Sequence, residues 1–160
     1  MDHVDRILAQ WQTERPDLDP SPMAVIGRLS RAATSVTAEL ASTFARHGID
    51  ASTFDALATL RRQGSPYRLA PAALASEAMV TTSAVAQRLN RLESLGLITR
   101  LPHPDDGRAK LVELTMAGKE LVDHVLPDHL ATEEALLENL SPQERKMLAE
   151  LLSRFLPASR

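Results

Sequence analysis

The sequence contains no cysteine in its 160 residues, and this absence removes several kinds of chemistry at once. Without a thiol there is no disulfide, no thiolate nucleophile, no iron–sulfur cluster and no cysteine-ligated zinc site. Long hydrophobic runs are also missing, since no stretch approaches the roughly 18 apolar residues that cross a membrane. The first fifteen residues lack the basic-then-apolar layout of a secretion signal. We therefore expect a cytoplasmic protein that does not contact a membrane.

Sequence motifs of catalysis are missing as well. The chain has no Gly-x-Ser-x-Gly motif, no phosphate-binding loop and no dinucleotide-binding glycine pattern. His124 with Asp128, and His129 with Glu133, have the i, i+4 spacing of a metal-binding pair, but a solvated helix face is the more common origin of such spacing. The sequence therefore predicts no enzyme, no cofactor and no metal.

The charge is unevenly distributed along a chain that otherwise has the composition of one globular domain, residues 1–160. Hydrophobic residues make up 44% and charged residues 24%, and the net charge is −3. The segment from Arg61 to Lys110 contains eight basic and four acidic residues, a net +4, which leaves −7 for the two ends. A basic middle favours a polyanionic partner, with chance as the alternative explanation.

Apolar residues at steps of three and four predict a series of helices. A short helix ends before Pro16, and Pro20 and Pro22 continue the break as a linker. A long amphipathic helix then runs from about Ile26 to Gly48. Further helices are predicted from Phe54 to Gly64, from Pro71 to Ala78, from Val85 to Leu95, from Thr115 to about Leu126, where Pro127 kinks or restarts the chain, and from Ser141 to Phe155.

Two strands, Leu97 to Leu101 and Ala109 to Leu114, surround a Pro-His-Pro-Asp-Asp-Gly turn and predict a β-hairpin. The helix before the hairpin has an apolar back and a polar front. Two short helices joined by a polar turn and followed by a hairpin are typical of a winged helix-turn-helix. The predicted fold class is therefore mainly α with a small β-hairpin wing (α+β).

A helix of this kind fits the major groove of DNA, which admits one α-helix at a time. Base reading needs polar side chains at the start of the helix and longer donors behind them, and the candidates are Thr81, Thr82, Ser83, Gln87 and Arg91. Arg108 at the hairpin tip and Lys110 beside it could place cations at the minor groove or the DNA backbone. A solvated surface explains any one of these residues alone, but their joint spacing favours DNA.

One run of residues and the positions that follow it carry a resemblance to a known family. They are the run from Val85 to Ile98 and then Arg100, Asp105, Asp106, Arg108, Leu114, Thr115 and Gly118. On these residues the sequence resembles the MarR-type winged-helix repressors, over about residues 23–156. This resemblance implies an obligate homodimer in which helices of residues 1–48 and 115–160 interlock, while lobes of residues 49–114 read a palindromic operator in double-stranded DNA. Gly107 departs from the family, whose wing usually carries a further arginine there, and gives Arg108 more importance.

A finer resemblance is to the urate-responsive branch of that family, which has an additional N-terminal helix bearing a tryptophan. The four positions that match this branch are Trp11, Asp55, Arg88 and Arg100. They imply a binding site for a small anionic ligand, urate or a related purine metabolite. Gln87 replaces an asparagine that is common beside the arginine of the recognition helix.

The residue types of such a site suit a planar anion, because it needs an aromatic wall and guanidinium groups that bind in a bidentate manner. Asp55 could pair with Arg100 in the unliganded protein and be displaced when a second negative charge arrives, a switch that the resemblance implies. Because Arg88 belongs to the DNA-reading helix, a ligand that draws on it could tilt that helix.

Two alternatives remain open from the sequence. A regulator of the same build could respond to phenolic or lipophilic molecules instead of urate. A helical dimer could also act only as a protein-binding module or weak enzyme, without contacting DNA.

Overall fold

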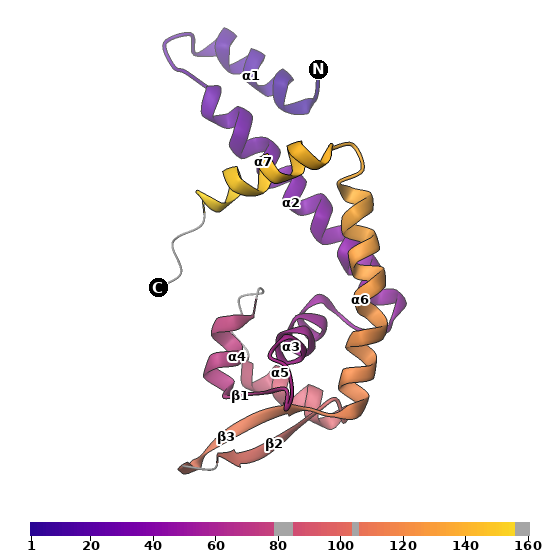
Figure 1. Ribbon diagram of the computed structural model, residues 1–160. Helices are drawn as coiled ribbons and strands as arrows, with labels where there is room; N and C mark the ends of the chain where they lie inside the picture. The colour runs from indigo at the N-terminus through magenta and orange to yellow at the C-terminus, as the bar shows by residue number, and fades with distance from the viewer. Residues whose placement is uncertain (79–84, 104–105, 156–160) are drawn as a thin grey trace. The chain divides into compact units, whose positions relative to one another are not determined.

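The computed structural model describes residues 1–78, 85–103 and 106–155, which form mostly helices and one small antiparallel sheet (Figure 1). This confirms the predicted fold class. The chain divides into two compact units, Met1–Glu39 and Leu40–Arg160. The predicted winged-helix lobe, residues 49–114, lies entirely within the second unit, and the assignment of the flanking helices to a dimer interface stays a prediction.

The first unit contains α1 (His3–Glu14) and most of α2 (Ser21–Arg46). Asp2 caps α1 by accepting a hydrogen bond from the backbone N–H of Asp5, whose side chain bonds back to the N–H of Asp2. The guanidinium of Arg28 on α2 donates to both carboxylates, at 2.9 and 2.5 Å. These contacts fix α1 against the first half of α2.

The long helix begins earlier than the sequence predicts. The linker prediction for Pro22 is wrong, because α2 starts at Ser21 and places this proline in its first turn. The first backbone N–H groups of a helix have no intrahelical acceptor, so a proline there forfeits no hydrogen bond. The predicted end is confirmed: Gly48 adopts φ +70°, and the N–H of Ile49 bonds to the carbonyl of Phe44.

The second unit contains the remaining helices, and each one was predicted. They are α3 (Ala51–Arg62), α4 (Pro71–Glu77), α5 (Val85–Ser94), α6 (Met116–Leu136) and α7 (Pro142–Ser153). Side-chain caps start α3, α6 and α7, and the capping residues are Asp50, Thr115 and Ser141 in that order. Gly96, at φ +69°, ends α5 before the hairpin as expected.

The predicted end or restart of the helix at Pro127 is wrong, because α6 continues through this proline to Leu136, and a kink at Pro127 stays a prediction. Proline cannot donate the backbone hydrogen bond of this turn, but packing continues past it. Beyond Pro127 the ring of His129 stacks on Phe44 and lies tilted against Phe54, with centroids 5.5 and 4.7 Å away. The buried face of α6 thus extends on both sides of the proline.

The sheet is formed by β1 (Arg68–Leu69), β2 (Ile98–His103) and β3 (Asp106–Leu114), and it is antiparallel throughout with the order β1-β3-β2. The pairing of β2 with β3 confirms the predicted hairpin, with Arg100 opposite Val112. The predicted turn is too long, because Pro102, His103 and the Asp106-Gly107 pair lie in the strands. The two-residue strand β1, which pairs with the far side of β3, was not predicted.

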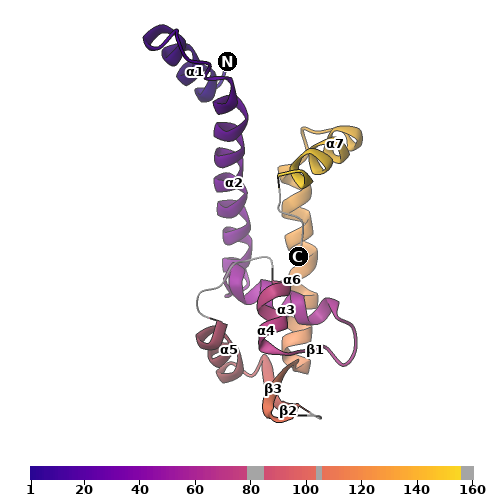
Figure 2. The same ribbon diagram turned by 90° about the vertical axis from the view of Figure 1, so that its left-hand side faces the viewer.

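The hydrophobic core of the second unit lies between the helices and the sheet. Figure 1 shows α3 between α4 and α6, and in Figure 2 α5 lies to one side of α3 and α4. Every one of these elements contributes buried side chains, so the orientation of α5 is set by the same core that holds the sheet. The most deeply buried of them include Leu57, Leu60, Leu74, Leu89, Leu92, Ile98, Val112, Val122 and Val125.

A compact backbone junction joins the end of α5 to the start of α6. The hydroxyl of Thr115 donates to the carbonyl of Gly96 at 2.7 Å and accepts from the N–H of Gly118 at 3.1 Å. The N–H of Thr115 also donates to the carbonyl of Leu97, at 3.1 Å. Gly118 is buried against that same carbonyl, and a Cβ atom there would lie far inside contact distance.

We therefore expect Gly118→Ala to lower the free energy of unfolding by roughly 1–3 kcal/mol, because the clash is with backbone and outweighs the better helix propensity of alanine. Gly27→Ala is the matched control, since its Cβ would meet only Val4 at 3.4 Å and should be neutral or stabilising. Urea unfolding followed by circular dichroism measures both variants. Equal stability of Gly118→Ala and wild type would contradict the close approach.

Candidate functional site

Helix α5 has one buried side and one exposed side, as the sequence predicts. Leu89 is 3% exposed and Leu92 is fully buried, whereas Gln87 and Arg91 are exposed and Arg88 is half-buried. The residues with long polar side chains therefore lie on a surface that solvent or a large partner can reach.

Several predicted DNA-contacting residues are not described in structural terms. Thr81, Thr82 and Ser83 lie outside the described residues, and so does the side chain of Arg108. Lys110 is exposed on β3, opposite Pro102. The contribution of these five positions to a DNA surface stays a prediction.

Arg100 on β2 connects the hairpin to α5. Its guanidinium donates to the carboxylate of Glu93 at 2.9 Å and to the side-chain oxygen of Asn90 at 2.7 Å. The sequence analysis expected Asp55 as the acidic partner of Arg100, and the structure gives Glu93 in that role. Since both contacts are on α5, they hold the wing against the exposed helix.

Two of the four residues in the predicted ligand site meet in the structure. Asp55 on α3 is 8% exposed and lines one small cavity together with Arg88. The cavity has a volume of about 10 Å³, which is room for about one water molecule and not for a purine. Ligand entry would require the helices around it to move apart. The rest of its lining is apolar, from Ala56, Leu74, Ala75, Ala78 and Leu89.

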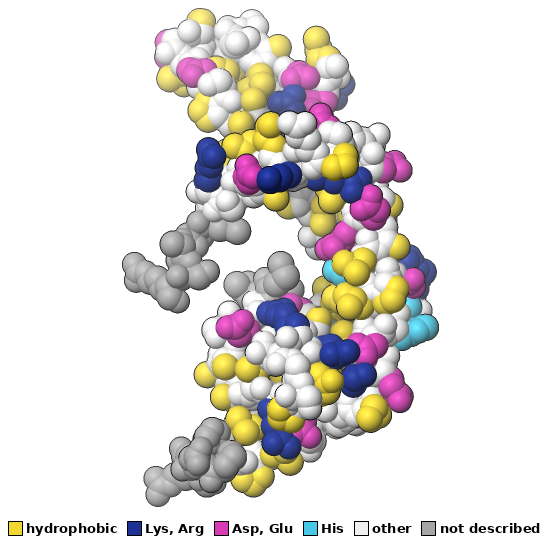
Figure 3. Space-filling model, viewed as in Figure 1, with side chains coloured by type: hydrophobic (Ala, Val, Ile, Leu, Met, Phe, Trp, Pro, Cys, Tyr) yellow, Lys and Arg dark blue, Asp and Glu magenta, His cyan; other side chains and the backbone are white. Residues whose placement is uncertain are grey.

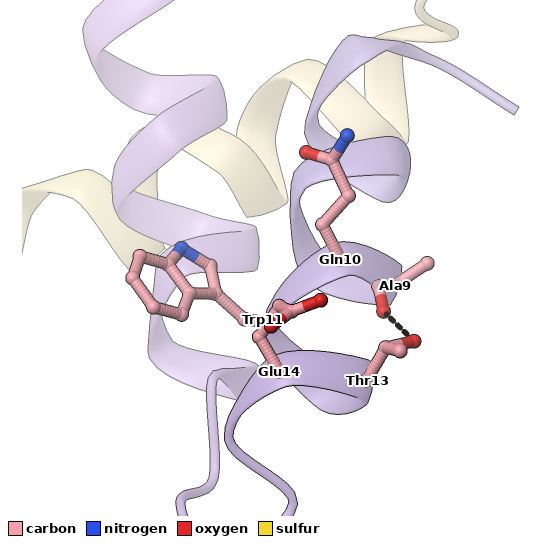
Figure 4. A pocket seen from close by; sticks show the side chains of 5 residues that line it. All are labelled: Ala9, Gln10, Trp11, Thr13 and Glu14. Atoms are coloured by element: carbon pink, nitrogen blue, oxygen red, sulfur yellow. Dashed lines mark hydrogen bonds between the residues drawn. The ribbon is translucent and has the colours of Figure 1, made fainter.

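Trp11 belongs to the first unit, and its meeting with the other three residues stays a prediction. Figure 4 shows its indole projecting from α1, away from the hydrogen bond that Thr13 donates to the carbonyl of Ala9. Trp11 is 45% exposed and borders two open depressions of about 620 and 350 Å³. An aromatic surface that is partly open to solvent is suited to stacking on a planar molecule.

A larger groove lies between α4, α5 and the hairpin. Its volume is about 650 Å³, which is in the size range of small-molecule sites. The hairpin contributes the cations of Arg100 and Lys110 to its lining, while the lining residues from α4 and α5 are apolar. These apolar residues are Pro71, Ala72, Ala75, Ala86 and Leu89.

The sequence analysis missed Asp50, an acidic residue that contacts α5. Its carboxylate caps α3 and also accepts a hydrogen bond from Arg91 at 3.1 Å. Burial alone would raise the pKa of Asp50, but hydrogen bonds from Ser52 and Thr53, together with the charge of Arg91, lower it to about 2. An acidic residue at the start of a helical pattern is a recognisable cap signal, but its pairing across 41 residues is not.

Of the two pairs considered as metal ligands, the structure forms one. His129 contacts Glu133 at 3.2 Å, whereas Asp128 pairs with His47 at 2.9 Å. In the described part of the chain, no group of three or more metal-ligating side chains is placed to hold a metal ion. A search of the same residues finds no helix long and apolar enough to cross a membrane.

Comparison with known proteins identifies relatives of this chain. A sequence model of the MarR family matches residues 47–109. The HTH-type transcriptional regulator PecS of Dickeya dadantii is 39% identical over 151 residues, covering 94% of this chain and 91% of PecS.

Solved structures agree with this assignment. A MarR family regulator from Streptomyces coelicolor, solved in complex with DNA, has a TM-score of 0.79 and 25% identity, with 88% of this chain and 91% of that one covered. BpsR of Bordetella bronchiseptica, whose DNA binding is regulated by 6-hydroxynicotinic acid, has a TM-score of 0.74 and 26% identity over 82% of this chain and 91% of its own. The chain therefore belongs to the MarR family of winged helix-turn-helix transcriptional regulators.

Proposed function

We propose that this protein is a ligand-responsive repressor that binds a palindromic operator through α5. The observation that carries the proposal is the division of α5 into a buried side, with Leu89 and Leu92, and an exposed side, with Gln87 and Arg91. The buried side fixes the helix on the lobe, and the exposed side carries donors of the length that reaches base edges in the major groove.

A homodimer is supported by apolar side chains that this chain leaves exposed. Within Pro142–Ser153, all of which is described, α7 has no buried side chain. Figure 3 shows hydrophobic side chains on the surface of α6 and α7. Those that remain exposed on the two helices include Leu126, Leu130, Met147, Leu148, Leu151 and Leu152, and Phe155 just after α7 is exposed as well. A second copy would bury them, and a two-fold pair of lobes would read a palindrome.

The ligand response is assigned to the cavity of Asp55 and Arg88, with Trp11 and Arg100 as further ligand-binding residues. We propose urate or a related purine metabolite as the ligand. Because the cavity of about 10 Å³ is too small for a purine, binding would separate α3 from α5 and turn the DNA-reading helix. A hundredfold loss of operator affinity requires the ligand to favour the opened form by about 2.7 kcal/mol.

A second ligand class is favoured by the groove of about 650 Å³. Its apolar lining from two helices, with two cations from the hairpin, suits a phenolic or aromatic acid, and the DNA binding of the relative BpsR is regulated by such an acid, 6-hydroxynicotinic acid. A molecule bound there would touch α5 and Arg100 together, so it could also alter how α5 is presented.

DNA binding is tested with the duplex that lies next to the protein's own gene, by gel shift over a range of salt concentrations. We expect the logarithm of affinity to fall linearly with the logarithm of salt concentration, with a slope of about −5 or steeper, which corresponds to about six neutralised phosphates. Gln87→Ala should cost roughly 1–3 kcal/mol on this duplex and little on a scrambled one.

Gln143→Ala on α7 is the matched control and should bind as wild type does. Wild-type affinity of the Gln87→Ala protein would show that α5 is not the reading helix. No shift of any duplex at low salt would instead favour a protein-binding module.

The ligand proposal is tested by thermal shift with urate, xanthine and salicylate. Urate at about 100 times its dissociation constant should stabilise the wild type by about 2.7 kcal/mol. Trp11→Phe and Arg88→Ala should lose most of this shift, whereas Arg6→Ala, an exposed change on α1, should keep it. By reciprocity, operator DNA should weaken urate binding by the factor by which urate weakens DNA binding. A shift with salicylate and none with urate would move the assignment to the larger groove.

A further inference from the structure

The contact between Asp50 and Arg91 joins the start of α3 to the exposed side of α5. One guanidinium nitrogen of Arg91, Nη1, donates to Oδ2 of Asp50 at 3.1 Å. The other carboxylate oxygen, Oδ1, accepts from the N–H of Thr53 at 2.7 Å and from the hydroxyl of Ser52 at 2.8 Å. Asp50 is thus held by its own helix and offers Arg91 an acceptor in a fixed position.

This pair lies beside a depression of about 260 Å³ between α3 and α5. Gln87, Arg88 and Arg91 line the depression from α5, so Asp50 places a negative charge next to the surface proposed to face DNA. The side chains are 62% exposed for Arg91 and 48% for Asp50. An ion pair this exposed contributes little to stability, which leaves a role in orientation and local charge.

We propose that Asp50 is a positioning residue that makes α5 more selective among DNA sequences. A guanidinium has five N–H donors, and the bond to Asp50 uses one of them, so Arg91 can keep this bond and direct the others at DNA. The carboxylate restricts the orientations of Arg91 and offsets its charge. The smaller charge reduces the attraction of Arg91 to phosphates, which are the same in every sequence. The restricted orientation preserves its directional bonds to bases. This inference rests on the proposed function.

Asp50→Asn is a sharp test, because asparagine caps helices as well as aspartate does but carries no charge. The experiment compares the duplex that the wild-type protein selects from a randomised pool with a scrambled duplex of equal length. We expect affinity for the scrambled duplex to rise roughly threefold to fivefold, because a negative charge has left the interface. The salt slope should become steeper by about 0.9 per neutralised phosphate gained. The ratio of selected to scrambled affinity should fall by at least threefold.

Asp50→Ser, which also keeps a cap, should behave as Asp50→Asn does, and both should melt within a few degrees of wild type. In an Arg91→Gln background the ratio should no longer change on Asp50→Asn. Asp123→Asn is the matched control. It removes a carboxylate of α6 that pairs with Arg61 on α3, the helix that Asp50 caps, and it should leave the ratio of selected to scrambled affinity unchanged.

The proposal would be overturned if both cap-preserving variants kept the wild-type affinity ratio and salt slope. Equal gains in affinity for the selected and the scrambled duplex would also overturn it, because Asp50 would then only lower the affinity for any DNA through its charge. A wild-type protein that binds no duplex would refute the proposed function instead.

Discussion

The burial of Leu89 and Leu92 in the core determines what every other side of α5 faces. Successive residues of an α-helix are rotated by about 100°, so fixing two positions fixes all the others. Arg88 and Arg91 fall on the side that meets α3, where Asp55 and Asp50 lie. Asn90 and Glu93 fall on the opposite side, where both contact Arg100 of the hairpin. Gln87 remains on the front. One core anchor therefore produces a helix with a neighbour on each flank and an exposed side between them.

Local signals in the sequence were enough to predict this helix and its surroundings. Periodicity gave α5, the glycine at position 96 gave its end, and the strand-like runs on either side of the proline-containing turn gave the hairpin. The same rules predicted too early an end for α6, because they treat Pro127 as a break and do not see Phe44 and Phe54 packing beyond it. They also missed β1, since two residues are too few for a periodic pattern.

The candidate site was harder to predict because its contacts are made between distant segments. The resemblance to the urate-responsive branch identified Asp55 and Arg88, which the structure brings to one cavity. It did not identify Asp50 as the partner of Arg91, nor Asn90 and Glu93 as the partners of Arg100. The sequence offers each arginine several possible polar partners and does not show which one it contacts. Which carboxylate each arginine takes depends on the approach of α3 and β2 to α5, and that approach is set by the core.

The strengths of these contacts explain how α5 could be both firmly placed and adjustable. Each buried leucine contributes about 1.5–3 kcal/mol, so the core keeps the helix on the lobe under any regulatory change. The flanking pairs of Arg91 with Asp50 and of Arg100 with Glu93 are partly exposed, and such pairs contribute up to about 1 kcal/mol each. A ligand that favours one arrangement by about 2.7 kcal/mol exceeds both pairs together and falls short of the two leucines. Regulation in this lobe would therefore exchange the partners of α5 on its flanks without releasing it from the core.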